Sequence, residues 1–104
     1  MGENTRAKSK VWLEKDDNVV YGDGRQALLK AIEQTGSIRQ AASKLGMSYR
    51  AAWGKIKATE ERLGFELVSK KAGGTDSGTN LTETGKEFMQ RYADFKKESI
   101  KAVD

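Results

Sequence analysis

Apolar residues recur at helical spacing in successive stretches of the central chain, and glycines or small polar residues separate these stretches. In the first stretch Leu28 and Ile32 share one face with the alanine between them, which predicts a helix over residues 24–35. Asp23 is suited to cap the start of this helix, and Gly36 is suited to end it.

Two shorter amphipathic stretches follow and predict two further helices. Ser37 is expected to cap the second helix and Ser48 the third, which ends at Gly64. Between these helices Gly46 provides the positive φ that a tight turn needs, and Met47 is the expected apolar plug of the turn. The predicted inward positions are Ile38, Ala41, Ala42 and Leu45 in the second helix, and Ala52, Ile56, Thr59 and Leu63 in the third.

The N-terminal part of the chain predicts a mobile arm and a hairpin. Residues 1–8 are polar without periodicity, so they are expected to form a flexible arm ahead of one domain over residues 9–104. Residues 11–13 and 19–21 are short β-prone runs on either side of residues 14–18, whose composition is typical of a turn.

The C-terminal part predicts a strand, a loop, a return strand and a long helix. Residues 65–68 alternate between apolar and polar positions as a short strand does, and residues 72–80 form a glycine-rich loop. Leu81 then belongs to a small return strand. Thr82 is suited to cap a last helix that extends to about residue 101.

This order of elements is typical of a winged helix-turn-helix. The predicted fold is therefore α+β and mostly helical, with a short N-terminal hairpin and a long C-terminal helix. Two helices that cross steeply over a short turn need small side chains at their contact, and four alanines provide them: Ala41, Ala42, Ala51 and Ala52. An ordinary αα-hairpin is the alternative for this central unit.

Composition narrows the classes of function. The chain has no Cys and no His, which excludes disulfides and thiolate chemistry and removes the usual general base and the commonest metal ligand. Glu60 and Glu61 are adjacent and expected on an exposed helix end, so they do not form a catalytic carboxylate pair. The longest apolar runs are triplets, too short for a membrane span or a signal peptide. We expect a cytoplasmic binding module without catalytic residues, metal or cofactor.

The basic residues are concentrated in the middle of the chain. The formal net charge is +4, and residues 25–78 alone carry ten basic and five acidic side chains. No acidic residue lies between Glu33 and Glu60, whereas five basic residues do. A localised basic region favours a polyanionic partner, and a solvated lysine-rich surface is the alternative.

Several motifs of the central chain are similar to a known family. The run Ser48-Tyr49-Arg50-Ala51-Ala52-Trp53 and the Gly73-Gly74 loop resemble the N-terminal DNA-binding domain of molybdate-responsive ModE-type regulators. More broadly, the paired alanines, Leu63-Gly64 and the run Leu81-Thr82-Glu83-Thr84-Gly85 resemble the LysR-type winged helix. The resemblance covers residues 9–103, nearly the whole chain.

This resemblance implies a homodimer that binds palindromic operator DNA and regulates transcription. ModE-type proteins usually carry C-terminal molybdate-binding domains, and this sequence ends at Asp104. Molybdate sensing is therefore not carried over; if an effector is sensed, we expect a separate chain to sense it.

The third predicted helix is expected to enter the major groove of duplex DNA, with its apolar residues turned away. Arg50 is expected at a guanine edge or at a phosphate, and the lysines at phosphates. Gly54 suggests a close approach of the DNA backbone; Trp53 either joins Tyr49 at bases and sugars or packs at the rim of the core. The residues assigned to DNA on this helix are Ser48, Tyr49, Arg50, Trp53, Gly54, Lys55 and Lys57.

Two other segments are expected at the DNA backbone. Ser37 and Arg39 lie at the start of the second helix. The wing spans residues 70–80, and a glycine-rich loop with basic residues at its base can follow a phosphate backbone. The wing residues assigned to DNA are Lys70, Lys71, Gly73, Gly74 and Thr75.

The last helix carries an apolar stripe wider than one small core needs. This width predicts a dimer interface formed by Phe88, Tyr92, Phe95 and Ile100. The same stripe supports an alternative function, a winged-helix module that binds a partner protein without contacting DNA.

Overall fold

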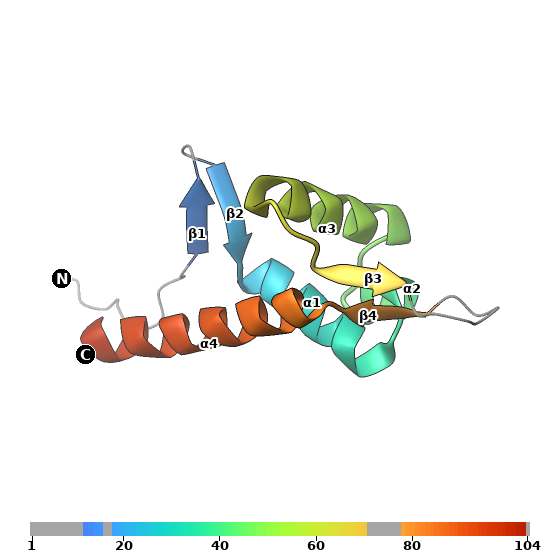
Figure 1. The fold of residues 1–104 in the computed structure, drawn as a ribbon. Helices are drawn as coiled ribbons and strands as arrows, with labels where there is room; N and C mark the ends of the chain where they lie inside the picture. The colour runs from blue at the N-terminus through green and yellow to red at the C-terminus, as the bar shows by residue number, and fades with distance from the viewer. Residues whose placement is uncertain (1–11, 16–17, 71–77, 104) are drawn as a thin grey trace.

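The computed structural model describes residues 12–15, 18–70 and 78–103, with the side chains of residues 21–70 and 78–98. The elements are β1 (Trp12–Lys15), β2 (Asn18–Gly22), α1 (Asp23–Thr35), α2 (Ile38–Lys44), α3 (Tyr49–Leu63), β3 (Val68–Lys70), β4 (Thr79–Leu81) and α4 (Glu83–Val103). β1 pairs antiparallel with β2, and β3 pairs antiparallel with β4. Figure 1 shows the two hairpins on opposite sides of the helical core, with α4 extending toward the β1–β2 side. The predicted winged helix-turn-helix is confirmed.

Local signals in the sequence fix the ends of α2 and α3. Ser37 and Ser48 are the N-caps, and each hydroxyl accepts a hydrogen bond at 3.0 Å from the backbone N–H three residues later. Gly64 ends α3 in the left-handed conformation with φ of 85°. Gly46 has φ of 73° in the turn between the helices, as predicted.

Leu45 departs from the prediction that it faces inward. It is 37% exposed, because α2 ends at Lys44 and Leu45 leaves the helical face as the C-cap residue. Met47 follows the turn and packs partly buried against the core, as expected of the apolar plug. The turn therefore has a single apolar plug.

Asp23 is the first residue of α1, and the prediction that it is the N-cap is wrong. Gly22 occupies the cap position without a side-chain hydrogen bond. The Asp23 carboxylate instead accepts a hydrogen bond from the Tyr92 hydroxyl at 2.9 Å and pairs with Lys96 at 2.9 Å. Burial, this hydrogen bond and the charge of Asp23 raise the pKa of Tyr92 to about 12. Asp23 thus links the start of α1 to α4.

An aromatic cluster joins the N-terminal hairpin to α4. The Tyr21 ring at the end of β2 is fully buried, and its centroid lies 4.7 Å from that of Phe88 and 5.0 Å from that of Tyr92, both edge-on. Tyr92 is only 2% exposed and Phe88 is half-buried, so both are used inside this chain. These contacts account for part of the width of the α4 stripe, which also covers Tyr21. The assignment of Phe88 and Tyr92 to a dimer interface stays a prediction.

The rest of the core lies between the helices and the base of the wing. The buried apolar residues besides these aromatics are Leu28, Leu29, Ala31, Ile32, Ile38, Ala41, Ala42, Ala52, Ile56, Leu67, Val68 and Leu81. Ala41, Ala42 and Ala52 are at most 1% exposed, which confirms the predicted role of small residues at the α2–α3 contact. Ala51 is exposed, so its assignment to this contact is wrong. The helix-turn-helix is therefore a closely packed unit, not a loose αα-hairpin.

Both hairpins differ in extent from the prediction. β1 includes Glu14 and Lys15, and β2 begins at Asn18, so the expected turn over residues 14–18 is too long. β3 begins at Val68, three residues later than expected, because the preceding residues serve other contacts: Phe65 packs its ring 5.8 Å from Phe88. β4 includes Thr79 and Asn80, which were expected in the loop.

Gly85, in the first turn of α4, packs directly against the chain that leads into β3. A Cβ at this position would lie 2.5 Å from the carbonyl oxygen of Leu67, which is closer than real Cβ atoms approach backbone oxygen. Nothing lies within 4 Å of the corresponding position at Gly54 in α3. The two glycines therefore offer a matched test of the packing at the base of the wing.

We expect Gly85→Ala to lower the free energy of unfolding by about 1–3 kcal/mol, because the methyl group displaces backbone. Gly54→Ala should raise it by about 0.5–1 kcal/mol through the better helix propensity of alanine. Urea denaturation followed by circular dichroism measures both. Equal effects of the two substitutions would contradict the close packing at Gly85.

Candidate nucleic-acid interface

The outward face of α3 is open to solvent. Ser48, Arg50, Gly54, Lys55 and Lys57 are all exposed, and no other described element covers them. Its two aromatic residues are exposed as well, Tyr49 by 41% and Trp53 by 46%. The exposure of Trp53 favours a role in contacting a partner and argues against packing at the rim of the core. Large exposed rings beside cations suit a surface that binds another molecule.

A groove runs between this face and the wing. Its volume is about 460 Å³, and one wall is formed by α3, the other by β3 and β4, with the start of α2 at one side. Its lining contains three cationic residues and no acidic one. The lining residues are Ser37, Ile38, Arg39, Gln40, Tyr49, Trp53, Lys57, Val68, Ser69, Lys70 and Thr79. The groove brings together residues that the sequence analysis had assigned to three separate segments.

Aromatic rings hold two of these cations in place. The guanidinium carbon of Arg39 lies 4.5 Å from the centroid of the Tyr49 ring, and Lys57 Nζ lies 5.6 Å from the centroid of the Trp53 ring. Arg39 comes from the first turn of α2 and Tyr49 from the first residue of α3, so the contact spans the helix-turn-helix. The rings thus restrict the long side chains at the groove surface.

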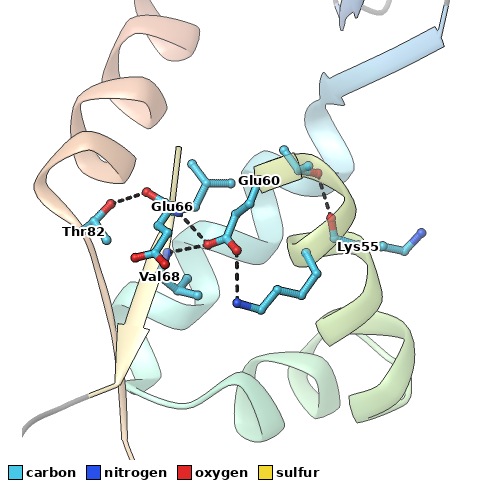
Figure 2. A network of polar contacts seen from close by, with 8 residues as sticks. Lys55, Glu60, Glu66, Val68 and Thr82 are labelled. Carbon is cyan, nitrogen blue, oxygen red and sulfur yellow. Dashed lines mark hydrogen bonds and ion pairs between the residues drawn. The ribbon is translucent and has the colours of Figure 1, made fainter. Parts of the chain in front are cut away.

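Glu60 is the residue of this region that the sequence analysis misplaced. It is 9% exposed, not on an open helix end, and its Oε1 forms an ion pair with Lys57 Nζ at 3.1 Å. Its Oε2 accepts hydrogen bonds from the backbone N–H groups of Leu67 at 2.7 Å and Val68 at 3.2 Å. Figure 2 shows the carboxylate between α3 and the wing. The signal was present in the sequence, because Glu60 follows the inward Ile56 by four residues and so shares its face.

Further polar contacts fix the surroundings of this carboxylate. The Thr59 hydroxyl donates to the Lys55 carbonyl at 2.7 Å and accepts from Arg25 Nε at 2.8 Å, which ties α3 to α1. The Thr82 hydroxyl donates to the Glu66 carbonyl at 2.7 Å (Figure 2). The base of the wing is therefore joined to both α3 and α4 by short polar contacts.

The remaining assigned residues divide into two groups. Lys70 is exposed at the end of β3, on the wall of the groove, and Ser37 is half-buried at the start of α2. Lys71, Gly73, Gly74 and Thr75 lie outside the described residues, and so does the side chain of Ile100. Phe95 is 46% exposed on α4.

Among the residues that the structure describes, no three acidic, histidine or cysteine side chains gather where they could hold a metal ion. Over the same residues, no helix combines the length and apolar character needed to cross a bilayer. The features that bear on function are thus the α3 face and the groove.

The chain matches a family of known proteins. The family described as bacterial regulatory helix-turn-helix protein, lysR family, matches residues 25–86. This region includes α1, the helix-turn-helix, the wing and the start of α4.

Two relatives match large parts of the chain, one of them nearly the whole of it. The molybdenum transport protein ModE of Azotobacter vinelandii is 36% identical over 101 residues, which cover 96% of this chain and 37% of the relative. The DNA-binding transcriptional dual regulator ModE of Escherichia coli K12 is 36% identical over 75 residues, 70% of this chain and 29% of the relative. The chain thus spans about a third of the length of these relatives.

The fold is also found in a solved structure. The crystal structure of a CbnR DNA-binding domain in complex with DNA superposes with a TM-score of 0.58 at 23% identity, covering 73% of this chain and 86% of that one. This likeness shows the shared fold.

Proposed function

This chain belongs to the lysR family of bacterial regulatory helix-turn-helix proteins, and we propose that it is a sequence-specific duplex-DNA-binding regulator of transcription. The observation that carries the proposal is the groove and the α3 face beside it, which present cations and exposed rings with no acidic residue in the lining. Such a surface matches the charge of a phosphate backbone. The role also fits the names of the relatives, one of which is a DNA-binding transcriptional regulator.

In this proposal α3 lies in the major groove, which is wide enough to admit a helix. Arg50, exposed in the first turn of α3, reads base edges, because a guanidinium can bond both acceptors of a guanine. Gly54 lies one turn further with nothing within 4 Å of its missing Cβ, so the helix can approach the DNA closely there. Base reading by an α3 residue gives the sequence preference.

The groove receives one sugar–phosphate strand. Arg39, Lys57 and Lys70 line it from α2, α3 and β3, and Lys55 is exposed on the flank of α3. Contacts to phosphates position the protein without reading sequence, and mobile lysines suit this role. The residues of the wing tip, Lys71, Gly73, Gly74 and Thr75, continue along the same strand in this proposal.

We also propose that the regulator is a homodimer. Phe95 is a large apolar residue left exposed on α4, after Phe88 and Tyr92 have been used inside the chain. A dimer formed through α4 would present two α3 helices to successive turns of DNA, about 34 Å apart. In this proposal the regulator acts in the bacterial cytoplasm, where it meets duplex DNA.

The affinity for duplex DNA should depend steeply on salt. If Arg39, Lys55, Lys57 and Lys70 each neutralise one phosphate, the slope of log affinity against log salt is about −3.6 per bound protomer. Fluorescence anisotropy titrations with a labelled duplex at several salt concentrations measure this slope. A flat salt response would contradict the proposal, and the absence of a mobility shift with any duplex at low salt would favour the protein-interaction module instead.

Base reading and phosphate contact should be separable by substitution. Arg50→Ala should reduce the preference for the selected site over random duplex by about 1–3 kcal/mol, because it removes a contact to base edges. Lys70→Ala should weaken binding to both duplexes alike. Lys30→Ala, which removes an exposed charge of α1 outside the groove, is the control. The assigned roles are wrong if Arg50→Ala weakens both duplexes equally.

Phe95→Lys should convert the dimer to a monomer, because it places a charge in the proposed α4 contact. Gln90→Lys adds the same charge at another exposed position of α4 and should leave the dimer intact. Analytical ultracentrifugation gives the oligomeric state. Selection of bound sites from random duplexes gives the symmetry of the site, which should be two-fold for the wild type. An unchanged dimer in Phe95→Lys would exclude this residue from the interface.

A further inference from the structure

Glu60 lies behind the groove and touches both of its walls. Its Oε1 pairs with Lys57, which lines the α3 wall, and its Oε2 accepts the N–H of Val68, which begins the β3 wall. We propose that Glu60 is a positioning residue that fixes the separation of the two walls and so places Lys57 and Lys70 on the same phosphate strand. The inference rests on the proposed function, since the strand is that of the bound duplex.

The Glu60 carboxylate accepts hydrogen bonds from three donors. The N–H groups of Leu67 and Val68 are bonded to one oxygen, and the Lys57 ammonium is bonded to the other (Figure 2). β3 and β4 have three residues each, and a hairpin of this size does not hold its place by its own strand pairing. Val68 and Leu81 anchor the hairpin in the core, and the Glu60 carboxylate adds directional bonds that set its position relative to α3.

Only an ionised carboxylate can accept from all three donors. An amide offers one oxygen and one NH₂ group, so in Glu60→Gln the NH₂ must face either the Lys57 ammonium or the two backbone N–H groups. Two donors then face each other, and that contact is lost. Whichever way the amide turns, one wall of the groove is released.

The direction in which DNA affinity changes when the Glu60 charge is removed distinguishes a positioning role from a purely electrostatic one. Removing a negative charge near DNA should strengthen binding if long-range electrostatics alone mattered. Removing a positioning group should weaken it. Glu61 is the matched control, because it is the next residue of α3, carries the same charge and is exposed.

The experiment compares Glu60→Gln and Glu61→Gln in titrations with a labelled duplex, below the temperature at which either variant begins to unfold. We expect Glu60→Gln to weaken binding about ten-fold, which is the effect of losing about 1.4 kcal/mol of contact. Glu61→Gln should bind as tightly as the wild type or more tightly. If the wild type binds and the two variants behave alike, the proposal for Glu60 is overturned while the proposed function stands. A wild type that binds no duplex overturns both.

A second readout distinguishes positioning from a general loss of stability. Lys57→Ala and Lys70→Ala are each measured in the wild type and in the Glu60→Gln background. If Glu60 positions the walls, at least one lysine substitution loses most of its effect in that background, because its cation no longer reaches the phosphate. If both keep their full effect, Glu60 does not position them.

Hydrogen exchange keeps the proposal testable even if Glu60→Gln does not fold. In the free wild-type protein the amides of Leu67 and Val68 should exchange slowly, since both are bonded to Glu60. Their protection should increase when duplex DNA is bound. Exchange of these amides at the rate of an unprotected peptide would overturn the proposal.

Discussion

The close contact between α2 and α3 is the constraint on which the rest of the molecule depends. Ala41, Ala42 and Ala52 are at most 1% exposed, and their small side chains let the two helices approach. The Met47 N–H donates to the Ala42 carbonyl at 2.9 Å, which closes the turn around Gly46. Because the inner face of α3 is committed to this contact, its opposite face must point outward. The exposed cations and rings of α3 follow from that commitment.

The wing is too small to have a core of its own, so it is held by the buried side chains at its base, Leu67, Val68 and Leu81, and by polar contacts. Besides the bonds to Glu60, the Thr79 N–H donates to the Gly36 carbonyl at 2.8 Å and the Thr82 N–H to the Leu67 carbonyl at 2.9 Å. The first bond joins the wing to the α1–α2 turn, and the second closes the base of the wing between the residues that flank β3 and β4. A buried ion pair adds little net stability, because desolvation offsets the attraction between the charges, so the role proposed for Glu60 is to set geometry. The geometry that it fixes is that of the groove.

The parts of the fold that were predictable from the sequence are those set by neighbouring residues. Ser37 and Ser48 cap helices by contacts three residues away, and Gly64 and Gly46 meet a local need for positive φ. Leu45 was misplaced for a local reason, the early end of α2, but other errors concern partners distant in the chain. Asp is a residue type that often caps helices, but the Asp23 carboxylate accepts a hydrogen bond from Tyr92, 69 residues away.

The same limit applies to the candidate site. The residues of α3 that face outward followed from the helical period, whereas the enclosure of Lys57, Lys70 and Arg39 in one groove depends on how the wing packs. The contacts of Phe88 and Tyr92 with Tyr21 were not predictable, because nothing near them in the sequence reveals that Tyr21 packs against both rings. The inward position of Glu60 could have been predicted from its spacing to Ile56, but its contacts with Leu67 and Val68 could not.

The contacts that restrain the cationic side chains affect how strongly a few of them can bind a polyanion. A long side chain loses about 0.5–1.5 kcal/mol of conformational freedom when binding immobilises it. Arg39 is already restricted by the Tyr49 ring, and Lys57 by the Trp53 ring and Glu60, before any partner arrives. Less freedom then remains to be lost at the moment of contact. The rings therefore increase what Arg39 and Lys57 contribute to binding. A domain with a net charge of only +4 can in this way present an effective surface for binding a polyanion.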